Sequence, residues 1–169
     1  LTNNAELAQK IDKAVFPGLQ GGPHNNNIAG IAIALEEALK PKYIEYCKQV
    51  IKNAQSLAKS LQTRSFDIVS GGTENHLLLV DLRNKNIDGD TLSKALNSVN
   101  IETNKNTIPF DTASPFKPNG IRLGTPAITT LGLQEQDMEI IAEFIHQVIL
   151  NISNKKFILL FKKIGRAHV

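Results

Sequence analysis

One arginine stands out as a residue that needs an anionic partner. Arg122 lies in an expected short strand at 120–123, between the apolar residues Ile121 and Leu123, and the sequence Gly-Thr-Pro follows it. Taking a guanidinium out of water is costly unless an anion compensates its charge. The pattern therefore predicts a carboxylate close to Arg122, supplied either by the protein itself or by a ligand.

The segment before this arginine carries other groups that could contact a ligand. The sequence Asn-Lys-Asn at 104–106 is expected to form a compact turn with two amides and a base. A proline-broken loop follows, with Ser-Pro-Phe at 114–116 and Lys-Pro-Asn-Gly at 117–120. Clusters of Pro and Gly favour irregular backbone. The residues alone therefore predict an exposed loop without revealing what it binds.

A pair of glycines could bind a phosphate. Gly21 and Gly22 lie in the segment 16–23, which holds three glycines and two prolines and leads into an apolar helical segment from Ile28. Bare backbone N–H groups before a helix can hold a phosphate. However, the spacing matches neither the dinucleotide-binding nor the Walker pattern. On the residues alone, an ordinary turn before a helix is the favoured interpretation.

Two more side chains could do chemistry, but each has a simpler role. His76, at the start of an expected strand, could act as an acid or base, although such a histidine more often bonds a backbone carbonyl. Cys47 lies on an apolar helix stripe, where a thiol usually packs as a small apolar group. A single cysteine allows no internal disulfide or metal cluster. We therefore predict no metal site and a reducing, cytoplasmic compartment.

The charge of the chain is unevenly distributed. Of its 19 Lys and Arg residues, five lie in the last fifteen positions, which hold no acids, so the rest of the chain carries fourteen bases against sixteen acids. Without a basic face, and with only 5% aromatic residues, we expect no nucleic-acid partner. There is no run of eighteen apolar residues, so we expect no membrane-spanning helix.

Hydrophobic periodicity indicates the elements that position these groups. Residues 4–14 fit an amphipathic helix, and 28–64 fit one long helix that Pro41 breaks or kinks. The small apolar residues at 28–35 predict close packing in buried surroundings. From residue 65 the period changes to two, which is typical of strands. We expect these strands at 66–68, 76–82, 101–103 and 120–123.

Two further helices complete the expected fold. One, capped by Asp88 or Asp90, runs to Val99, and the other occupies 134–150. Together these elements predict an α+β unit, a small antiparallel sheet with helices on one face. The expected division of the chain is a tail of a larger domain, a connecting helix, a small α/β domain and a terminal tail, at 1–27, 28–64, 65–150 and 151–169.

The terminal tail combines an apolar run with lysine pairs. This composition fits either a helix end or a basic amphipathic segment. The last six residues, 164–169, read back to codons that resemble a translated sequencing adapter. We therefore expect the native sequence to stop at or before Lys163, and we expect His168 to bind nothing. The start of the chain lacks an initiator methionine, which suggests a segment of a longer protein.

Four motifs, taken together, resemble serine hydroxymethyltransferase. They are AVFPGLQGGPHNN at 14–26, VSGGTENHLLLVDLR at 69–83, ETNKNTIPFD at 102–111 and SPFKPNGIRLGTPAIT at 114–129. The similarity extends over roughly residues 4–150 without large gaps, and four separate motifs make it specific. It implies the C-terminal part of a fold-type-I pyridoxal-phosphate transferase. This part would comprise the tail of the large domain, the connecting helix and the small C-terminal domain.

The resemblance implies roles for the arginine and the glycines. Arg122 matches the family arginine that binds the carboxylate of serine or glycine, which favours a ligand as its partner. Gly22, and less directly Gly21, matches the glycine whose N–H meets the phosphate of pyridoxal 5'-phosphate across a dimer interface. Asn26 and Asn27, just beyond Gly22, depart from the residues that relatives usually show there.

The resemblance also implies a folate site. Asn106 matches the asparagine at the pteridine of tetrahydrofolate, the co-substrate that accepts the one-carbon unit. The loop that lines the folate site corresponds to Ser114, Pro115 and Phe116. The whole enzyme would interconvert serine and glycine as a homodimer or homotetramer.

Several catalytic groups of the family would lie before Leu1. These are the lysine that carries the cofactor, the aspartate at its pyridine nitrogen, a stacking histidine and a glutamate that shuttles protons. Lys105 lies on the folate side and cannot replace that lysine, so we expect the chain alone to be inactive. Two alternatives are a non-catalytic small-domain binding module and another fold-type-I enzyme such as an aminotransferase. An aminotransferase would keep the arginine but would not need the folate residues.

Overall fold

The computed structural model describes residues 2–165 and consists of two compact units. The first is Leu1–Tyr43 and the second Ile44–Val169. The expected adapter-derived end falls largely outside the described residues, which include only 164 and 165 of that stretch. The predictions about the native end of the sequence and about His168 therefore lie outside the described residues.

The first unit begins with a short helix and a wide helical turn. Helix α1 (Ala5–Lys13) lies one residue inside the expected range at each end, and the side chain of Asn4 caps it by accepting a hydrogen bond from a backbone N–H of the first turn. A wide turn, η1 (Ala14–Leu19), follows, and within it Phe16 has extended backbone. The irregular segment expected from residue 16 therefore starts inside an interrupted helical turn.

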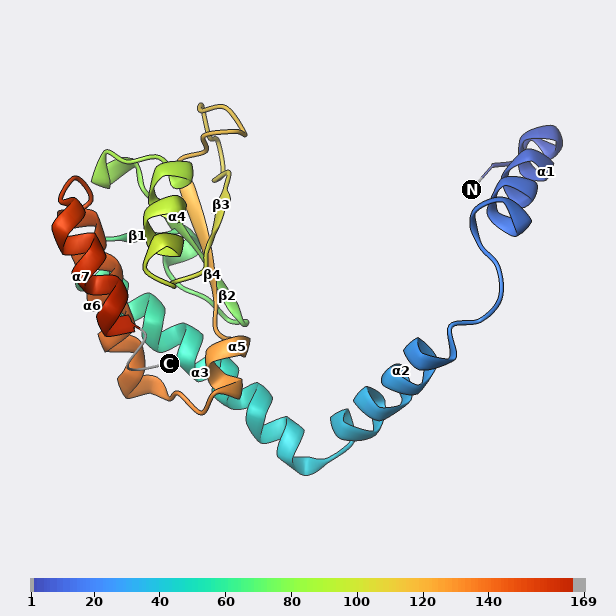
Figure 1. Ribbon diagram of the computed structural model, residues 1–169, viewed down its shortest axis with the longest axis horizontal. Helices are drawn as coiled ribbons and strands as arrows, with labels where there is room; N and C mark the ends of the chain where they lie inside the picture. Colours follow the sequence, from blue (N-terminus) through green and yellow to red (C-terminus); the bar gives the residue numbers. More distant parts are fainter. Residues whose placement is uncertain (1, 166–169) are drawn as a thin grey trace. The chain divides into compact units, whose positions relative to one another are not determined.

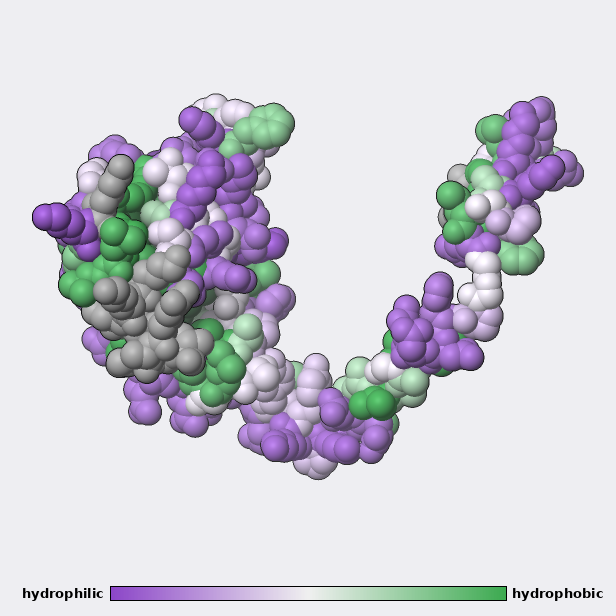
Figure 2. All heavy atoms as spheres, in the orientation of Figure 1, coloured by the Kyte–Doolittle hydropathy of each residue, from purple (hydrophilic) through white to green (hydrophobic). Residues whose placement is uncertain are grey.

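Helix α2 (Asn25–Ala38) carries apolar residues that the first unit leaves uncovered. None of its residues is buried, and Ile31 and Leu35 are 60% and 63% exposed. Figure 2 shows hydrophobic surface along this helix. We expected its first half to be closely packed. A helix that is apolar on most sides needs a partner surface, and residues 2–43 do not supply one.

The break expected at Pro41 separates two helices. Helix α2 ends at Ala38, and α3 (Pro41–Gln62) begins with the proline. Proline disfavours a helical conformation in the residue before it but is tolerated in a first helical turn. From Ile44 onward, α3 belongs to the second unit. Its buried residues recur at helical spacing and are Val50, Asn53, Ala54, Leu57, Ala58 and Leu61.

Four antiparallel strands form the sheet of the second unit in the order β1-β2-β4-β3 (Figure 1). The strands are β1 (Asp67–Ile68), β2 (Leu77–Asp81), β3 (Asn104–Asn106) and β4 (Gly120–Gly124). Short helical turns, η2 (Val69–Gly71) and η3 (Arg83–Lys85), lie before and after β2. The prediction of an α+β unit with a small antiparallel sheet is confirmed.

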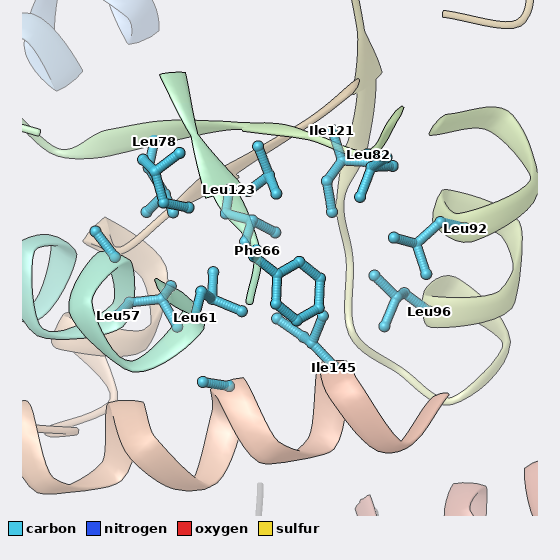
Figure 3. Packing of buried hydrophobic residues seen from close by; sticks show 14 of the residues in the cluster. Leu57, Leu61, Phe66, Leu78, Leu82, Leu92, Leu96, Ile121, Leu123 and Ile145 are labelled. Carbon is cyan, nitrogen blue, oxygen red and sulfur yellow. The ribbon is translucent and has the colours of Figure 1, made fainter. Parts of the chain in front are cut away.

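Helices cover one face of this sheet. They are α3, α4 (Gly89–Ser98) and α6 (Glu135–Leu150), and the short α5 (Pro126–Thr130) leads from β4 into α6. Asp88, one of the two predicted caps, accepts a hydrogen bond from Thr91 N at 2.8 Å. The core joins these helices to alternate residues of the central strands (Figure 3), and its largest members include Leu61, Leu78, Leu92, Leu96, Ile121, Leu123 and Ile145.

The third strand lies three residues after its predicted position. Residues 101–103, predicted as a strand, have no regular structure, and 104–106, predicted as a compact turn, form β3. Thr103 N donates to Asn97 Oδ1 at 3.1 Å, and Thr103 O accepts a hydrogen bond from Ser93 Oγ at 2.9 Å. These bonds tie 101–103 to α4. The N–H and C=O groups of Thr103 are therefore satisfied without a neighbouring strand.

The terminal tail forms a separate helix after a turn, and it is not the end of α6. Helix α7 (Lys155–Gly165) contributes Phe161, which stacks on Phe157 at 5.2 Å between ring centroids and meets the edge of Phe144 in α6 at 5.0 Å. Ile158 and Phe161 also pack against the core. Within residues 2–165, no helix is long and apolar enough to cross a bilayer.

Candidate functional site

The sheet face opposite the helices carries two of the predicted ligand-binding residues, Asn106 and Arg122. Successive side chains of a strand point to opposite faces. In β4, Ile121 and Leu123 are buried, whereas Arg122 is exposed on the other face. The register pairs Arg122 with Asn104 and Gly120 with Asn106. We name as the open sheet face the surface formed by Leu77, Leu79, Asn104, Asn106, Arg122 and Gly124.

Arg122 is solvated, contrary to expectation. Its apolar neighbours in sequence, Ile121 and Leu123, point into the core, and strand alternation carries the guanidinium outward. The desolvation cost that predicted a nearby carboxylate is therefore absent. Within residues 2–165, no carboxylate pairs with Arg122 and no hydrogen bond holds it. Its planar donor group is therefore available to an anion from outside this part of the chain.

Asn106 lies on the same face, where β3 passes into the loop 107–119. Its side chain is half-buried, and its Nδ2 donates to Thr107 O at 2.7 Å. A Cβ at Gly120 would come within 2.6 Å of Ile108 Cγ2 and 2.8 Å of Asn106 O. Glycine at 120 thus leaves space for the buried Ile108 against the sheet. This close approach fixes the start of the loop beside Asn106.

One carboxylate holds the base of this loop. Asp111 Oδ1 accepts hydrogen bonds from Ala113 N and Asn119 Nδ2 at 2.9 and 2.8 Å, and its Oδ2 accepts one from Asn119 N at 3.0 Å. The backbone N–H of Asn119, followed by that of Ala113, lowers the pKa of Asp111. The sequence prediction did not include Asp111. An aspartate followed by small and polar residues signals such side chain–backbone bonds and could have revealed it.

The three predicted loop residues form a tight turn at the loop tip. Phe116 N donates to Ser114 Oγ at 3.3 Å, and Lys117 N donates to Ser114 O at 2.9 Å. Pro115 lies between them, and its ring restricts the backbone. The Phe116 ring is 81% exposed. An aromatic ring held in water by an ordered turn offers a flat apolar surface to a ligand.

Gly21 and Gly22, in the first unit, present open backbone. A Cβ at either position would meet no atom within 4 Å. Within residues 2–43, neither N–H donates to another backbone group. Helix α2 begins at Asn25, three residues after Gly22. Free N–H groups just before the positive end of a helix dipole fit a phosphate group, and the assignment of these glycines to a cofactor stays a prediction.

The other candidates have structural environments. His76 is exposed, and its carbonyl accepts hydrogen bonds from Thr125 N and Oγ1 at 3.0 and 3.3 Å. Its ring makes no hydrogen bond within the described residues, so the predicted bond from that ring to a carbonyl is wrong. Cys47 is half-buried on α3. In the described part of the chain, no group of three His, Cys, Asp or Glu residues could hold a metal.

Two shallow hollows lie away from all of these residues. One, of about 640 Å³, is lined by the turn after α6, and the other, of about 580 Å³, lies beside Phe16 in the first unit. Neither contains a residue predicted to bind substrate, cofactor or folate. The predicted sites are instead an open sheet face, a loop turn and an open backbone segment.

Sequence comparisons relate this chain to known proteins. The family model of serine hydroxymethyltransferase matches residues 2–145, which include every predicted site residue. The serine hydroxymethyltransferase of Acidothermus cellulolyticus is 51% identical over 148 residues, 88% of this chain and 35% of that protein. Those of Rickettsia canadensis and Methanosarcina barkeri are each 50% identical, over 92% and 94% of this chain and 37% and 38% of their own lengths.

These matches have two consequences. The chain spans little more than a third of the length of the curated relatives it matches. The identity is nevertheless high and extends over both units, because the matched residues run from the start of the chain into α6. The chain belongs to the serine hydroxymethyltransferase family.

Proposed function

We propose that this chain is the C-terminal part of a pyridoxal-phosphate enzyme that interconverts serine and glycine and transfers the one-carbon unit to tetrahydrofolate. One observation supports this most directly. Arg122 and Asn106 project from neighbouring strands on the open sheet face, and the loop carrying Ser114–Phe116 connects those two strands. An amino-acid carboxylate and a folate would therefore bind side by side.

Arg122 would bind the carboxylate of serine or glycine. A guanidinium forms two parallel hydrogen bonds with a carboxylate, which fixes orientation as well as position. The exposed position of Arg122 on a strand of the rigid sheet leaves its planar donor group available for this grip. Holding the carboxylate would align the bond to be broken at the substrate α-carbon with the cofactor ring, and such alignment lowers the barrier to reaction.

Asn106 and the loop would bind tetrahydrofolate. An asparagine amide offers both a donor and an acceptor, which suits the mixed edge of a pteridine ring. The bond from Asn106 to Thr107 O orients the amide. The turn of Ser114, Pro115 and Phe116 would line the site, with the exposed Phe116 ring as its apolar surface.

Pyridoxal 5'-phosphate would be held partly by this chain and partly by segments that it lacks. Gly22, assisted by Gly21, would donate backbone N–H groups to the phosphate across the interface of a homodimer or homotetramer. When bound, the cofactor supplies the electron sink for the bond broken at the substrate α-carbon. We place the lysine that attaches it in the portion of the relatives that this chain does not span, in a cytoplasmic enzyme.

The test compares two proteins, the full-length enzyme that contains this sequence and the 169-residue chain. With cofactor, serine and tetrahydrofolate, we expect the full-length enzyme to form glycine and the chain alone to show no turnover, because it lacks the cofactor lysine. Turnover by the chain alone would overturn the assignment of the lysine to another segment. Formation of a keto acid without dependence on tetrahydrofolate would instead indicate another fold-type-I reaction.

A further inference from the structure

Lys105 lies between the two asparagines of β3 but serves the opposite face of the sheet. Asn104 and Asn106 share the open sheet face with Arg122, whereas Lys105 pairs with the buried Ile121. Strand alternation therefore directs its side chain toward the face that α4 covers. A ligand on the open sheet face lies on the wrong side of the strand for this ammonium group.

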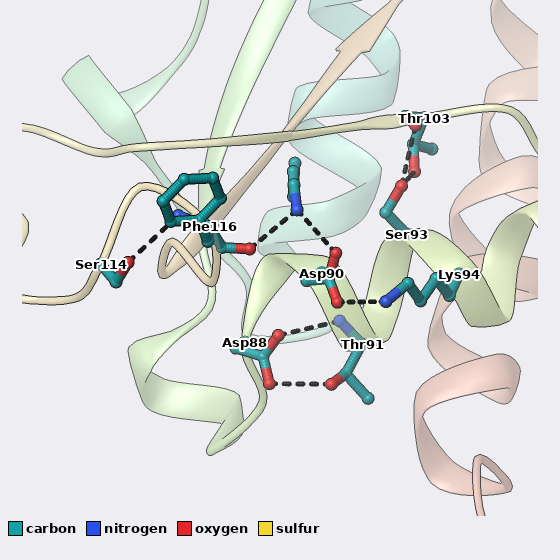
Figure 4. A network of polar contacts seen from close by, with 9 residues as sticks. Asp88, Asp90, Thr91, Ser93, Lys94, Thr103, Ser114 and Phe116 are labelled. Atoms are coloured by element: carbon teal, nitrogen blue, oxygen red, sulfur yellow. Dashed lines mark hydrogen bonds and ion pairs between the residues drawn. The ribbon is translucent and has the colours of Figure 1, made fainter.

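Two acceptors hold the Lys105 ammonium group. Its Nζ donates to Asp90 Oδ1 and to Phe116 O, each at 2.7 Å. Asp90 is in the first turn of α4, and Phe116 is at the tip of the loop (Figure 4). A charge-assisted bond to a carboxylate and a second bond to a carbonyl make this contact stronger than an ordinary surface pair. Lys105 thus ties the loop tip to the helix.

The loop 107–119 is held separately at its base and at its tip. Asp111 organises the base through Ala113 and Asn119, and there Pro118 O also accepts a hydrogen bond from Gly89 N of α4 at 2.7 Å. Lys105 contacts the tip. Within the described residues, the bond from Lys105 is the hydrogen bond that links the carbonyl of Phe116 to another element. Removing it would leave the turn intact, because that turn is closed by its own bonds to Ser114. The turn would then move as a unit about its base.

The environment of Asp90 keeps the contact charged. Lys105 and then Lys94 lower the pKa of Asp90 to about 2 through their hydrogen bonds. Lys94 Nζ bonds the other oxygen of Asp90, Oδ2, at 2.6 Å, but it makes no bond to the loop. The two lysines therefore share one carboxylate and differ in whether they reach Phe116. This difference makes Lys94 a matched control.

We propose that Lys105 is a positioning residue that clasps the Ser114–Phe116 turn to α4 and so presents the Phe116 ring to tetrahydrofolate. This inference rests on the proposed function, because it takes the turn as the folate-binding surface. It assigns to Lys105 neither contact with folate nor proton transfer. Its carboxylate partner, Asp90, belongs to α4 on the covered side of the sheet, and its function is to keep the loop tip in place through the bond to Phe116 O.

The first experiment measures steady-state kinetics of the full-length, cofactor-loaded enzyme. Lys105→Met keeps the aliphatic length and removes both bonds, and we expect it to raise the KM for tetrahydrofolate roughly tenfold, which corresponds to about 1.4 kcal/mol. The KM for serine, and kcat at saturating folate, should change less than about twofold. Lys94→Met should leave all three constants unchanged. Lys105→Arg keeps the charge and should restore part of the folate affinity.

The second experiment measures amide hydrogen exchange in the same proteins without folate. We expect faster exchange in the peptide 111–119 of Lys105→Met and unchanged exchange there in Lys94→Met, because only the first variant frees the loop tip. A fall in kcat with unchanged exchange would overturn the inference, since it would indicate a chemical role for Lys105. So would an enzyme in which neither folate KM nor exchange changes.

The proposed function and this inference fail in different ways. An unmodified full-length enzyme without tetrahydrofolate-dependent turnover contradicts the proposed function. The inference about Lys105 alone is contradicted if the unmodified enzyme has normal turnover and the Lys105→Met variant has a normal KM for folate and normal amide exchange.

Discussion

The two faces of the sheet in the second unit use the same strands for different purposes. On the covered face, Val80 and Ile121 are fully buried beneath α3, α4 and α6. On the open sheet face, residues one position away carry a guanidinium and two amides in contact with solvent. Strand alternation places Ile121 and Arg122 on opposite faces, and so separates a residue of the core from a predicted ligand-binding residue.

This separation shows how a small domain can carry an exposed ligand-binding site without losing folding stability. Each apolar residue of β4 contributes to the core, so Arg122 can be lost or changed without leaving a cavity. Conversely, the core residues of β2 and β4 point away from the open sheet face. Substitutions on the two faces should therefore have effects of different kinds. Two predictions test that expectation, and a third, with a smaller expected effect, concerns the loop beside the open sheet face.

The largest effect is expected at Arg122. In the full-length enzyme, Arg122→Ala should raise the KM for serine by roughly 30-fold to several thousandfold, the equivalent of about 2–5 kcal/mol for a buried charge left without its partner. The thermal unfolding midpoint should hardly change, because the side chain is exposed and unpaired within the described residues. Steady-state kinetics and thermal denaturation provide the two measurements.

Arg122→Lys is the matched control for that prediction. It keeps the charge but loses the two-pronged geometry, so it should recover only part of the serine affinity. An unchanged serine KM in Arg122→Ala would contradict the assignment of Arg122 to the substrate carboxylate.

The next effect is expected one residue away, at Ile121. Ile121→Ala should lower the free energy of unfolding by about 2–4 kcal/mol, because the fully buried side chain leaves a cavity among Val80, Leu92 and Leu96. The serine KM of the folded enzyme should stay within about twofold of the original. Urea unfolding measures the first quantity. Leu79→Ala, on the open sheet face, should cost clearly less, and equal losses at both positions would contradict the comparison.

The smallest effect is expected at Asp111. Its hydrogen bonds lower its pKa in the folded protein, so its contribution to stability is fully present above the ordinary pKa of about 4 and is lost as the pH falls through the lowered value. Asp111→Asn should therefore lower the thermal midpoint slightly at pH 7, and this difference should shrink on acidification below about pH 4. Glu102→Gln, at an exposed position, is the control. A difference that is constant with pH would contradict this explanation.

Much of the second unit followed from periodicity. The apolar runs at 76–82 and 120–123 predicted β2 and β4, and the three-to-four spacing after Asp88 and in 134–150 predicted α4 and α6. These segments could be predicted because each buries one continuous face, so the apolar pattern and the final packing agree. The open position of Arg122 follows from strand alternation. The sequence prediction instead took the apolar neighbours of Arg122 along the chain, Ile121 and Leu123, as a sign that the guanidinium is removed from water.

The features that escaped prediction depend on contacts between distant segments. Residues 101–103 have strand propensity, but hydrogen bonds to α4 hold them outside the sheet. Asp111 and Lys105 act by reaching backbone groups up to eleven residues away, and composition cannot reveal which group a long side chain will find. The role of Gly120 likewise depends on where Ile108 packs.

The short outer strands have a consequence for association between molecules. β1 has two residues and β3 has three, and these are the edges of the sheet. An exposed edge invites pairing with a strand of another chain, and very short edges that carry a lysine suppress such aggregation. The sheet can therefore leave one whole face bare for small molecules and still offer little template for the growth of intermolecular β-structure.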